Sequence, residues 1–453
     1  AWQRLKAEEL LTQQLSQWQS RQERLSLRAP TLIPTGAAAD LPAQLLQALP
    51  FDLTTAQARV QAEIAADLSR PEPMHRLLQG DVGSGKTVVA ALAAAHCMAA
   101  GWQCALMAPT EILAEQHFRK LIGWLEPLLS PLGLEVAWLT GSQKKKTRDA
   151  MLALIADGRA ALVVGTHAVI QEQVQFRSLA LAIIDEQHRF GVAQRLALRH
   201  KLQPSSTPGS EGAAEPHLLM MSATPIPRTL AMSYYADLDV STLDELPPGR
   251  TPVVTKVVSE QRRDEVIDRI RAQVAQGRQV YWVCPLIEES EALDLRNATD
   301  THARLSDALR NSNAGVTGKE TASMDLEAAR NSDGEVPAHG IEVGLLHSRL
   351  PEVDKKAIMA RFVSGEMAVL VSTTVIEVGV DVPNASLMVI EHAERFGLSQ
   401  LHQLRGRVGR GAAASACVLL YSLGEHGRLS DTARERLRAM VDTQDGFEIA
   451  RRD

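Results

Sequence analysis

The stretch LLQGDVGSGKTVVAALAAAHC, residues 77–97, determines how the rest of this sequence is interpreted. Two leucines lead into a glycine-rich loop, and an alanine-rich run that favours a helix follows the loop directly. The loop matches the pattern G-x-x-x-x-G-K-[ST], in which backbone amides and the helix N-terminus can cradle phosphates. In this pattern Lys86 would reach the β- and γ-phosphates, and Thr87 would hold Mg²⁺. The sequence therefore predicts a nucleotide site that consists of Gly80, Asp81, Val82, Gly83, Ser84, Gly85, Lys86 and Thr87.

A second stretch, LALAIIDEQHRFGV (179–192), carries two acids directly after an apolar run. The run predicts a strand that is buried on both faces. Burying an unpaired carboxylate is costly, so Asp185 and Glu186 need either a solvent edge or a cation. A strand that simply emerges into water would explain them if they stood alone. With the phosphate loop in the same chain, we predict that Asp185 holds Mg²⁺ and that Glu186 orients and deprotonates the water attacking the γ-phosphate.

Length and composition describe a multi-domain globular protein. The 453 residues exceed what one core can organise, so two or three domains are expected. The net charge of −6, from 48 basic and 54 acidic residues, neither suggests nor excludes nucleic-acid binding, because phosphate contacts need only local positive charge. No apolar stretch is long enough to cross a membrane, no signal peptide is recognisable, and the four cysteines form no CxxC pair. We therefore expect reduced core thiols and a cytoplasmic location.

Short apolar runs alternate with helical stretches through two regions of the chain. In the first region the runs CALMAPT, ALVVGTH, LAIIDE and HLLMMSAT each end in small or polar residues. In the second region the corresponding runs are QVYWVCPL, VGLLHS, AVLVSTT and LMVIEHA. Such alternation predicts an α/β fold with two parallel sheets covered by helices, whose sites lie at the carboxyl ends of the strands.

The proline-rich segment LPPGRTP separates these two regions and predicts a linker. Two polar segments, 203–216 and roughly 297–338, are expected to be loop insertions with little core material. The first 27 residues favour a helix whose apolar stripe either packs on its neighbour or connects to a domain outside the chain; the stripe consists of Leu11, Leu15, Trp18 and Leu25. The predicted organisation is a helix and connector (1–49), a first domain (50–246), the linker (247–252), a second domain (253–425) and a helical extension (426–453).

The arginines of HQLRGRVGRG (402–411) add a candidate catalytic group to the second region. A basic solvated loop would also explain this composition, but the segment follows a predicted buried strand. Arg407 and Arg410 are three residues apart and are expected on one helical face. From there they could act on the γ-phosphate as arginine fingers.

The motifs together resemble those of superfamily-two helicases. The phosphate loop, DEQH (185–188), SAT (222–224) and QLRGRVGR (403–410) occur in the order that is typical of these proteins. The resemblance to the bacterial RecG branched-DNA helicases is closer still and covers the chain from about Phe51 to Phe447. It rests on the segments GDVGSGKTVVA, APTEILAEQH, VGTHAVIQ, DEQHRFGVAQR, MSATPIPRTL and STTVIEVGVDVPNAS.

The resemblance implies two RecA-like domains and an ATP- and Mg²⁺-dependent motor that unwinds branched DNA, such as replication forks and Holliday junctions, in recombination and repair. It implies binding to branched or duplex DNA through the phosphate backbone, a single-strand-binding protein as a partner, a monomeric state and no membrane association. The stretch PFDLTTAQ would recognise adenine through Phe51, Thr54 and Gln57, with Gln57 reading the base edge, although an ordinary helix start capped by Thr54 would also explain it. Gly379 and Asp381 would be further nucleotide contacts. Residues that couple hydrolysis to domain movement would be His188, Ser222, Thr224 and Gln403. DNA contacts would be Pro109, Thr110, Glu111, Thr140, Gly141, Thr166, His167, Thr373 and Thr374.

The chain departs from the family pattern at both ends. RecG proteins carry a wedge domain before the motor and a glycine-rich translocation loop after DGF, whereas this chain begins with Ala1 and ends at Asp453. We therefore expect a fragment that binds and hydrolyses ATP but regresses forks poorly. Two alternatives stay open: the motor of a transcription-repair coupling factor, and a non-motor ATP switch. A switch would bind ATP with little DNA-stimulated hydrolysis.

Overall fold

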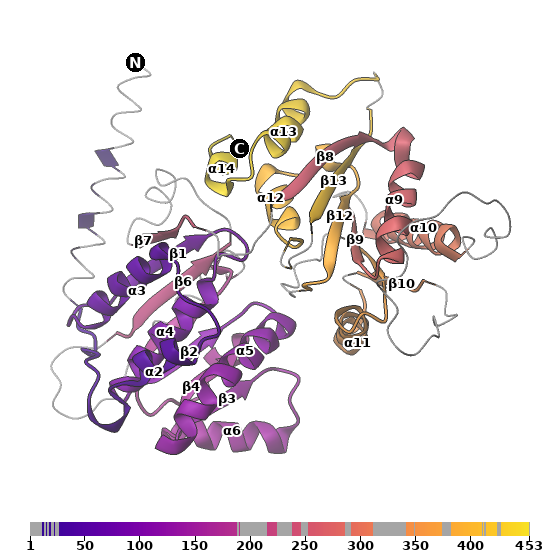
Figure 1. The fold of residues 1–453 in the computed structure, drawn as a ribbon. Coiled ribbons are helices and arrows are strands. Elements are labelled where there is room, and N and C mark those ends of the chain that lie inside the picture. The colour runs from indigo at the N-terminus through magenta and orange to yellow at the C-terminus, as the bar shows by residue number, and fades with distance from the viewer. Residues whose placement is uncertain are drawn as a thin grey trace, which may run out of the picture. The chain divides into compact units, whose positions relative to one another are not determined.

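The computed structural model divides into two compact units (Figure 1). The first unit comprises Ala1–Gly249 with Gly446–Arg451, and the second comprises Arg250–Asp445 with Arg452–Asp453. The structure describes residues 11, 12, 15, 18, 19, 22, 27–187, 190, 215–223, 238–245, 252–285, 291–310, 341–347, 349–373, 382–409, 411, 414–423 and 427–452.

The first unit contains a seven-stranded parallel sheet in the order β3-β4-β2-β5-β6-β1-β7. The four apolar runs predicted as strands in this region are strands β2, β4, β5 and β6, so that prediction is confirmed. The strands are β1 (His75–Gly80), β2 (Gln103–Met107), β3 (Glu135–Leu139), β4 (Ala160–Gly165), β5 (Leu179–Ile184), β6 (His217–Ser222) and β7 (Asp239–Leu243).

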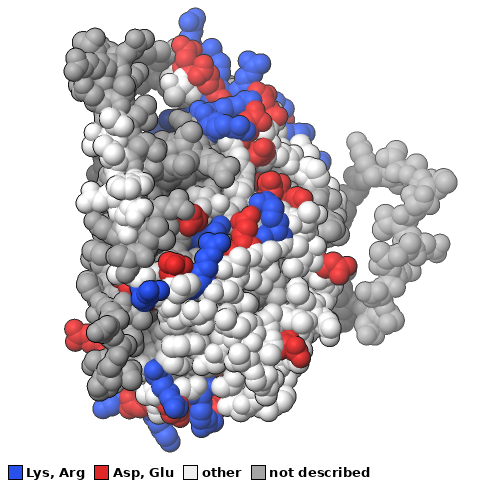
Figure 2. Space-filling view, turned by 90° about the vertical axis from the view of Figure 1, so that its left-hand side faces the viewer, with Lys and Arg blue, Asp and Glu red and all other residues white. Residues whose placement is uncertain are grey.

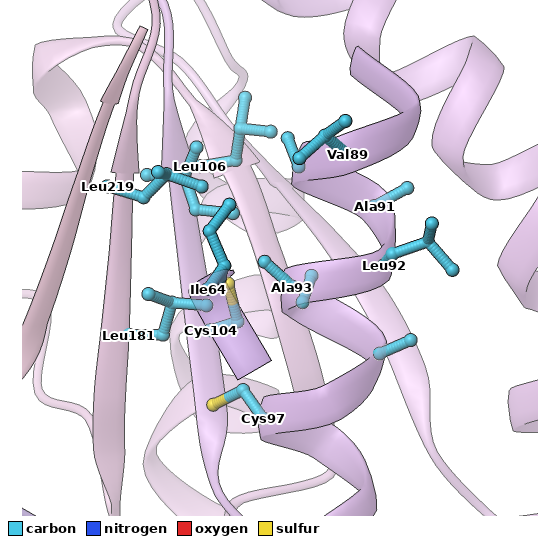
Figure 3. Packing of buried hydrophobic residues seen from close by; sticks show 14 of the residues in the cluster. Ile64, Val89, Ala91, Leu92, Ala93, Cys97, Cys104, Leu106, Leu181 and Leu219 are labelled. Carbon is cyan, nitrogen blue, oxygen red and sulfur yellow. The ribbon is translucent and has the colours of Figure 1, made fainter. Parts of the chain in front are cut away.

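Helices cover both faces of this sheet, as the alternating pattern predicts. Alternate strand residues pack into two separate cores: Leu78 and Leu106 contribute to one, and Leu77 and Met107 to the other. The first core includes side chains of α2, α3, α4 and α5, and the second includes Ile155 of α6. Figure 3 shows the first core, with helix α4 packed on the strands. The helices are η1 (Gly36–Ala38), α2 (Leu41–Ala48), α3 (Thr55–Leu68), α4 (Lys86–Ala99), α5 (Glu111–Leu129), η2 (Ser130–Leu132), α6 (Lys145–Asp157) and η3 (His167–Ile170).

The second unit contains a six-stranded parallel sheet in the order β10-β11-β9-β12-β13-β8. The four runs predicted here are strands β9, β10, β11 and β12. The strands are β8 (Val253–Ser259), β9 (Gln279–Cys284), β10 (Val343–Leu346), β11 (Val369–Thr373), β12 (Ala385–Ile390) and β13 (Ser415–Tyr421). The helices are η5 (Glu260–Arg262), α9 (Arg263–Ala275), α10 (Glu291–Arg310), α11 (Glu352–Val363), η7 (Ala393–Arg395), α12 (Leu398–Arg405), α13 (Asp431–Asp442) and α14 (Gly446–Arg452).

The expectation of a loop insertion at 297–338 is wrong for its first part. Residues 297–310 belong to helix α10, and its Ala298, Leu305 and Leu309 are buried in the core of the second unit. These three residues recur at helical spacing, a signal that the polar composition of the segment obscured. The remainder, 311–340, lies outside the described residues, as does most of the other predicted insertion, 203–216.

Three further expectations concern the N-terminal stripe, the cysteines and the membrane. Leu11, Leu15 and Trp18 are helical, and each side chain is more than half exposed, while Leu25 lies outside the described residues. All four cysteines are buried and form no disulfide, as predicted. Burial raises the pKa of the Cys417 thiol to about 12, so this group stays protonated at neutral pH. Among the described helices, none is long and apolar enough to cross a membrane.

Candidate nucleotide site and DNA-contact surface

The predicted phosphate loop connects the end of β1 to the start of α4, and its backbone requires glycine at two positions. Gly85 caps α4 in the left-handed region, with φ at 86°. A Cβ atom there would lie 2.2 Å from Nε2 of Gln57. A Cβ atom at Gly80 would lie 2.5 Å from the hydroxyl of Ser84. Both glycines therefore allow close approaches that no larger residue permits.

The ammonium group of Lys86 lies across the loop. Its Nζ donates to the carbonyl oxygens of Gly80 at 2.7 Å and of Asp81 at 3.0 Å. Ser84 is fully buried, and its hydroxyl has no hydrogen-bond partner among the described residues. A cation, an unpartnered hydroxyl and the amides at a helix N-terminus form a donor set that fits a phosphate group.

Asp185 lies directly beyond β5 and is nine-tenths buried. Its backbone amide donates to Met107 at 2.8 Å, which continues the pairing of β5 with β2. One carboxylate oxygen accepts from the amide of Glu186 at 3.0 Å, and the other contacts Nε2 of His117 at 2.7 Å. Burial raises the pKa of Asp185, but His117, Lys86 and the Glu186 amide outweigh burial and hold the pKa below its usual value. An ionised carboxylate and the hydroxyl of Thr87 are oxygen ligands of the kind that Mg²⁺ prefers.

Glu186 adopts an unusual backbone conformation. Its φ is 49°, in a region that non-glycine residues rarely occupy. Such conformations cost free energy and concentrate at functional sites. The conformation is therefore consistent with the role predicted for Glu186, although it does not test that role.

The predicted adenine stretch is joined to the phosphate loop through Gln57. Thr54 and Gln57 form a capping box at the start of α3, and Nε2 of Gln57 donates to the carbonyl of Ser84 at 2.9 Å. Phe51 is half exposed and meets Trp124 edge-on, with ring centroids 6.4 Å apart. Thr54 is thus a helix cap, and Gln57 also braces the loop; reading of the base edge by Gln57 stays a prediction.

The predicted DNA contacts of the first unit come together on three neighbouring strands. Pro109 and Thr110 follow β2, Thr140 and Gly141 follow β3, and Thr166 and His167 follow β4. The order β3-β4-β2 makes these strands adjacent. Two backbone hydrogen bonds continue the pairing past the strand ends: Ala108 to Gly165 at 3.0 Å, and Thr166 to Leu139 at 3.3 Å.

Hydrogen bonds hold these strand ends in place. The Glu111 carboxylate accepts from both the amide and the hydroxyl of Ser142, at 3.1 and 2.7 Å. Arg148 donates to the Thr140 carbonyl at 3.1 Å. Thr110 caps α5 by accepting from the Leu113 amide. The geometry gives Glu111 a bracing contact, and its predicted contact with DNA stays untested.

In the second unit, Thr373 ends β11 and is buried, and its hydroxyl has no partner among the described residues. Ser222 ends β6 in the first unit and lies in register with Gln79 of β1. Gln403 lies in α12. The predicted site residues His188, Thr224, Thr374, Gly379, Asp381 and Arg410 lie outside the described residues.

The expectation that a helix carries Arg407 is wrong, and Arg410 lies outside the described residues. Helix α12 ends at Arg405, and Arg407 lies in the turn that follows, because Gly406 caps the helix and Gly409 adopts a φ of 79°. Arg405 is buried and donates to the carbonyls of Met440 and Thr443, both at 2.9 Å. Arg405 therefore fastens α12 to the end of α13.

Two polar residues at this site were not singled out from the sequence. His117 is the contact of Asp185, and its signal was available: Leu113, His117, Leu121 and Leu125 recur every four residues along a helix, which places a histidine on the buried face. Gln187 is 1% exposed, and neither polar atom of its side chain has a partner among the described residues. Its position inside DEQH was the available signal.

Comparison with known proteins defines the class. The family model for the DEAD/DEAH box helicase matches residues 57–233, and that for the helicase conserved C-terminal domain matches residues 303–412. A solved structure of yeast Dbp5 bound to RNA shares the fold, with a TM-score of 0.58 at 14% identity over 92% of each chain. The chain thus carries the paired RecA-like domains of a superfamily-two helicase.

The similarity to one group of helicases extends over the whole chain. The chain is 52% identical over 453 residues to the ATP-dependent DNA helicase RecG of Acidithiobacillus ferridurans, and 52% over 458 residues to that of Escherichia coli K12. It covers 59% of the length of each of these relatives. A solved structure of RecG bound to a three-way DNA junction matches with a TM-score of 0.75 at 39% identity, over 99% of this chain and 52% of that one. The chain therefore resembles RecG helicases over its whole length.

Proposed function

We propose that this chain is the ATP-driven motor of a helicase that acts on branched DNA. The observation that carries the proposal is the division of the first sheet. The phosphate loop and Asp185 lie at the ends of β1 and β5, and the predicted DNA contacts lie at the ends of β2, β3 and β4. Relatives named ATP-dependent DNA helicase RecG, and a RecG structure with a three-way junction, support branched DNA as the substrate.

Hydrolysis would depend on four residues of the first unit. Lys86 would exchange its contacts with the carbonyls of Gly80 and Asp81 for the β- and γ-phosphates of ATP. Bound Mg²⁺, held by Thr87 and Asp185, would supply charge neutralisation at the phosphates. Glu186 would orient the attacking water and accept its proton.

Residues of the second unit would complete the cycle. Arg407 and Arg410 are the proposed arginine fingers, and Gly379 and Asp381 are proposed nucleotide contacts. His188, Ser222, Thr224 and Gln403 are proposed to couple hydrolysis to domain movement, and Thr373 and Thr374 to contact the DNA backbone. The family resemblance supports these roles.

DNA would be held through its phosphates, so binding should be insensitive to base sequence and should weaken as salt increases. Basic and acidic side chains are interspersed on the face shown in Figure 2, in keeping with a net charge of −6. Local groups such as Lys144, Lys145 and Lys146, which are exposed at the start of α6, would supply the positive charge. A single-strand-binding protein as partner, a monomeric state and a cytoplasmic location stay proposals.

The test is ATP hydrolysis by the chain without DNA, with linear duplex and with a model fork, alongside Glu186→Gln. We expect stimulation by DNA, and loss of about 10²–10⁴-fold in turnover in Glu186→Gln, the range for removing a general base. Binding of ATP with no stimulated turnover would favour the ATP switch instead.

A further inference from the structure

The carboxyl edge of the first sheet is divided into two halves. The predicted DNA contacts follow β3, β4 and β2, and the predicted nucleotide residues follow β5 and β1, while Ser222, predicted to couple hydrolysis to movement, ends β6 between them. The boundary therefore runs between β2 and β5, which pair in register up to Met107 and Ile184. Any effect of DNA on the nucleotide half, within this unit, has to cross that boundary.

A buried side-chain hydrogen bond crosses the boundary. Helix α5 follows β2, and His117 lies six residues from its first residue, about 9 Å along the helix. Nε2 of His117 lies 2.7 Å from Oδ2 of Asp185, and both side chains are about one-tenth exposed or less. An ionised carboxylate is only an acceptor, so Nε2 carries the proton and donates it.

This hydrogen bond fixes the orientation of the carboxylate. The Glu186 amide holds Oδ1 and His117 holds Oδ2, and each oxygen keeps a lone pair for a metal ion. The N-terminus of α5 lies at the DNA half, where Thr110 is the N-cap and Glu111 is the first residue of the helix. The carboxylate of Glu111 accepts two hydrogen bonds from Ser142 in the loop after β3. A stiff helix therefore joins the strand ends of the DNA half to the carboxylate of the nucleotide half.

We propose that His117 is a positioning residue that sets the orientation of Asp185 according to the position of α5, so that DNA contacts at the start of α5 change the affinity of the site for Mg²⁺-nucleotide. This inference rests on the proposed function. A purely structural histidine would behave like His217, which is also buried and whose ring bonds the Met74 amide at 3.0 Å and the Pro30 carbonyl at 2.8 Å, at the start of β6.

The test compares three variants with the unaltered chain. His117→Phe removes the donor and keeps a ring of similar size. His117→Gln keeps a side-chain N–H donor. His217→Phe is the matched control, because it removes a buried histidine of the same unit from outside the site. For each we would measure the affinity for a fluorescent ADP with Mg²⁺ and with EDTA, the Mg²⁺ dependence of hydrolysis with and without fork DNA, and the melting temperature.

We expect His117→Phe to raise the Mg²⁺ concentration for half-saturation by about tenfold, the lower end of the effect of residues that orient metal ligands. Its affinity in EDTA should be unchanged, and fork DNA should no longer alter its Mg²⁺ dependence. His117→Gln should restore most of both effects. His217→Phe should lower the melting temperature and leave the Mg²⁺ dependence as it was. If His117→Phe does not fold, His117→Met, which also lacks a donor, takes its place.

Two results would overturn the proposal. One is an unchanged Mg²⁺ dependence in the donor-less variant. The other is an equal response to fork DNA in that variant and in the unaltered chain. Either result is compatible with DNA-stimulated turnover that Glu186→Gln abolishes. The proposed function would then stand although the inference about His117 fails. Absence of stimulated turnover in the unaltered chain would instead count against the proposed function, and the ADP affinities would still decide whether His117 positions Asp185.

Discussion

The two sheets of this chain follow one plan, and in the described part of the chain only the first sheet carries a phosphate loop. Six strands of the first sheet have the order β3-β4-β2-β5-β6-β1, and those of the second have β10-β11-β9-β12-β13-β8, so the strands correspond one to one in chain order. Strand β7 is an addition to the first sheet. The correspondence extends to single residues, which makes the differences informative.

A buried glutamine fastens each sheet in the same way. Gln103 begins β2, and its Nε2 donates to Ile155 at the end of α6 and to Ala160 at the start of β4, at 3.0 and 2.9 Å. Gln279 begins β9, and its Nε2 donates to Phe362 of α11 and to Met367 before β11.

The residues after the fifth strands also correspond. Asp185 and Glu391 each donate a backbone hydrogen bond to the neighbouring strand, at 2.8 and 2.9 Å. The next residues, Glu186 and His392, have φ values of 49° and 47° and are the non-glycine residues of positive φ in the described part of the chain.

The difference lies in what the acid pairs with. Lys86 and Arg263 are the first residues of corresponding helices, α4 and α9. Lys86 bonds to loop carbonyls, whereas Arg263 pairs directly with the Glu391 carboxylate at 2.5 Å and lies over the Trp282 ring at 5.0 Å. At the same position of the fold, the first unit thus has a lysine that can bind a phosphate, whereas in the second unit the basic residue is already paired with an acid. Function depends on the loop and not on the sheet alone.

The largest expected effect is on turnover. Lys86→Ala should reduce ATP hydrolysis by about 10²–10³-fold, because it removes a donor aimed at the charge that develops in the transition state. Arg263→Lys, at the corresponding position, should leave nucleotide affinity unchanged. Steady-state hydrolysis and titration with a fluorescent nucleotide would measure both. Loss of nucleotide binding in Arg263→Lys would contradict this expectation, because it would show that the position of the Arg263–Glu391 ion pair takes part in nucleotide binding.

The next effect is on stability. Arg263→Met leaves the Glu391 carboxylate buried without its cation, which should lower the free energy of unfolding by about 3–5 kcal/mol. Urea denaturation would measure the change. Adding Glu391→Gln should recover much of the loss, because no charge is then buried. Arg262→Met, in an exposed ion pair on the preceding residue, is the matched control and should leave stability as it was.

The paired glutamines allow a direct test of the common plan. Gln103→Leu and Gln279→Leu should each lower the free energy of unfolding by about 1–3 kcal/mol, because each leaves backbone carbonyls buried without a donor. Urea denaturation of the two variants under the same conditions would compare them. A loss confined to one variant would break the correspondence between the sheets.

The smallest expected effect is a pH dependence at His392. A hydrogen bond that His392 donates to the Glu394 carboxylate raises the pKa of His392 above its ordinary value, despite partial burial. A raised pKa in the folded protein stabilises it fully below pH 6.5, and this contribution is lost as pH rises through the folded pKa. The stability difference between the unaltered chain and His392→Gln should therefore be larger at pH 6 than at pH 9. A stability difference that did not change with pH would show that the hydrogen bond with Glu394 does not raise the pKa of His392.

Much of this fold could be predicted because buried strands appear in the sequence as short apolar runs that end in polar residues. Runs such as Ile183–Ile184 before Asp185 indicate both the strand and the edge at which its site lies. The end of α12 could not be predicted from the spacing of Arg407 and Arg410, because a capping glycine decided it. Helix α10 was missed because composition was given more weight than the spacing of Ala298, Leu305 and Leu309.

The candidate site likewise has parts that could be predicted from the sequence and parts that could not. The phosphate loop was evident because its pattern specifies backbone geometry. The His117 contact joins residues 68 positions apart, and no local pattern relates them. Its discovery required the register of β2 against β5. The histidine was nonetheless visible as a polar residue on an apolar helical stripe, which is a signal that can be applied to other sequences.

The edge-on contact of Phe51 with Trp124 has a practical consequence for spectroscopy. Trp124 lies on α5, the helix that also carries His117, and Phe51 begins the stretch proposed to bind adenine. Indole emission responds to the groups around the ring, so this tryptophan is an intrinsic optical probe of that stretch. Replacing the other five of the six tryptophans would isolate its signal, and stopped-flow mixing with nucleotide could then time the first step of the cycle without any added dye.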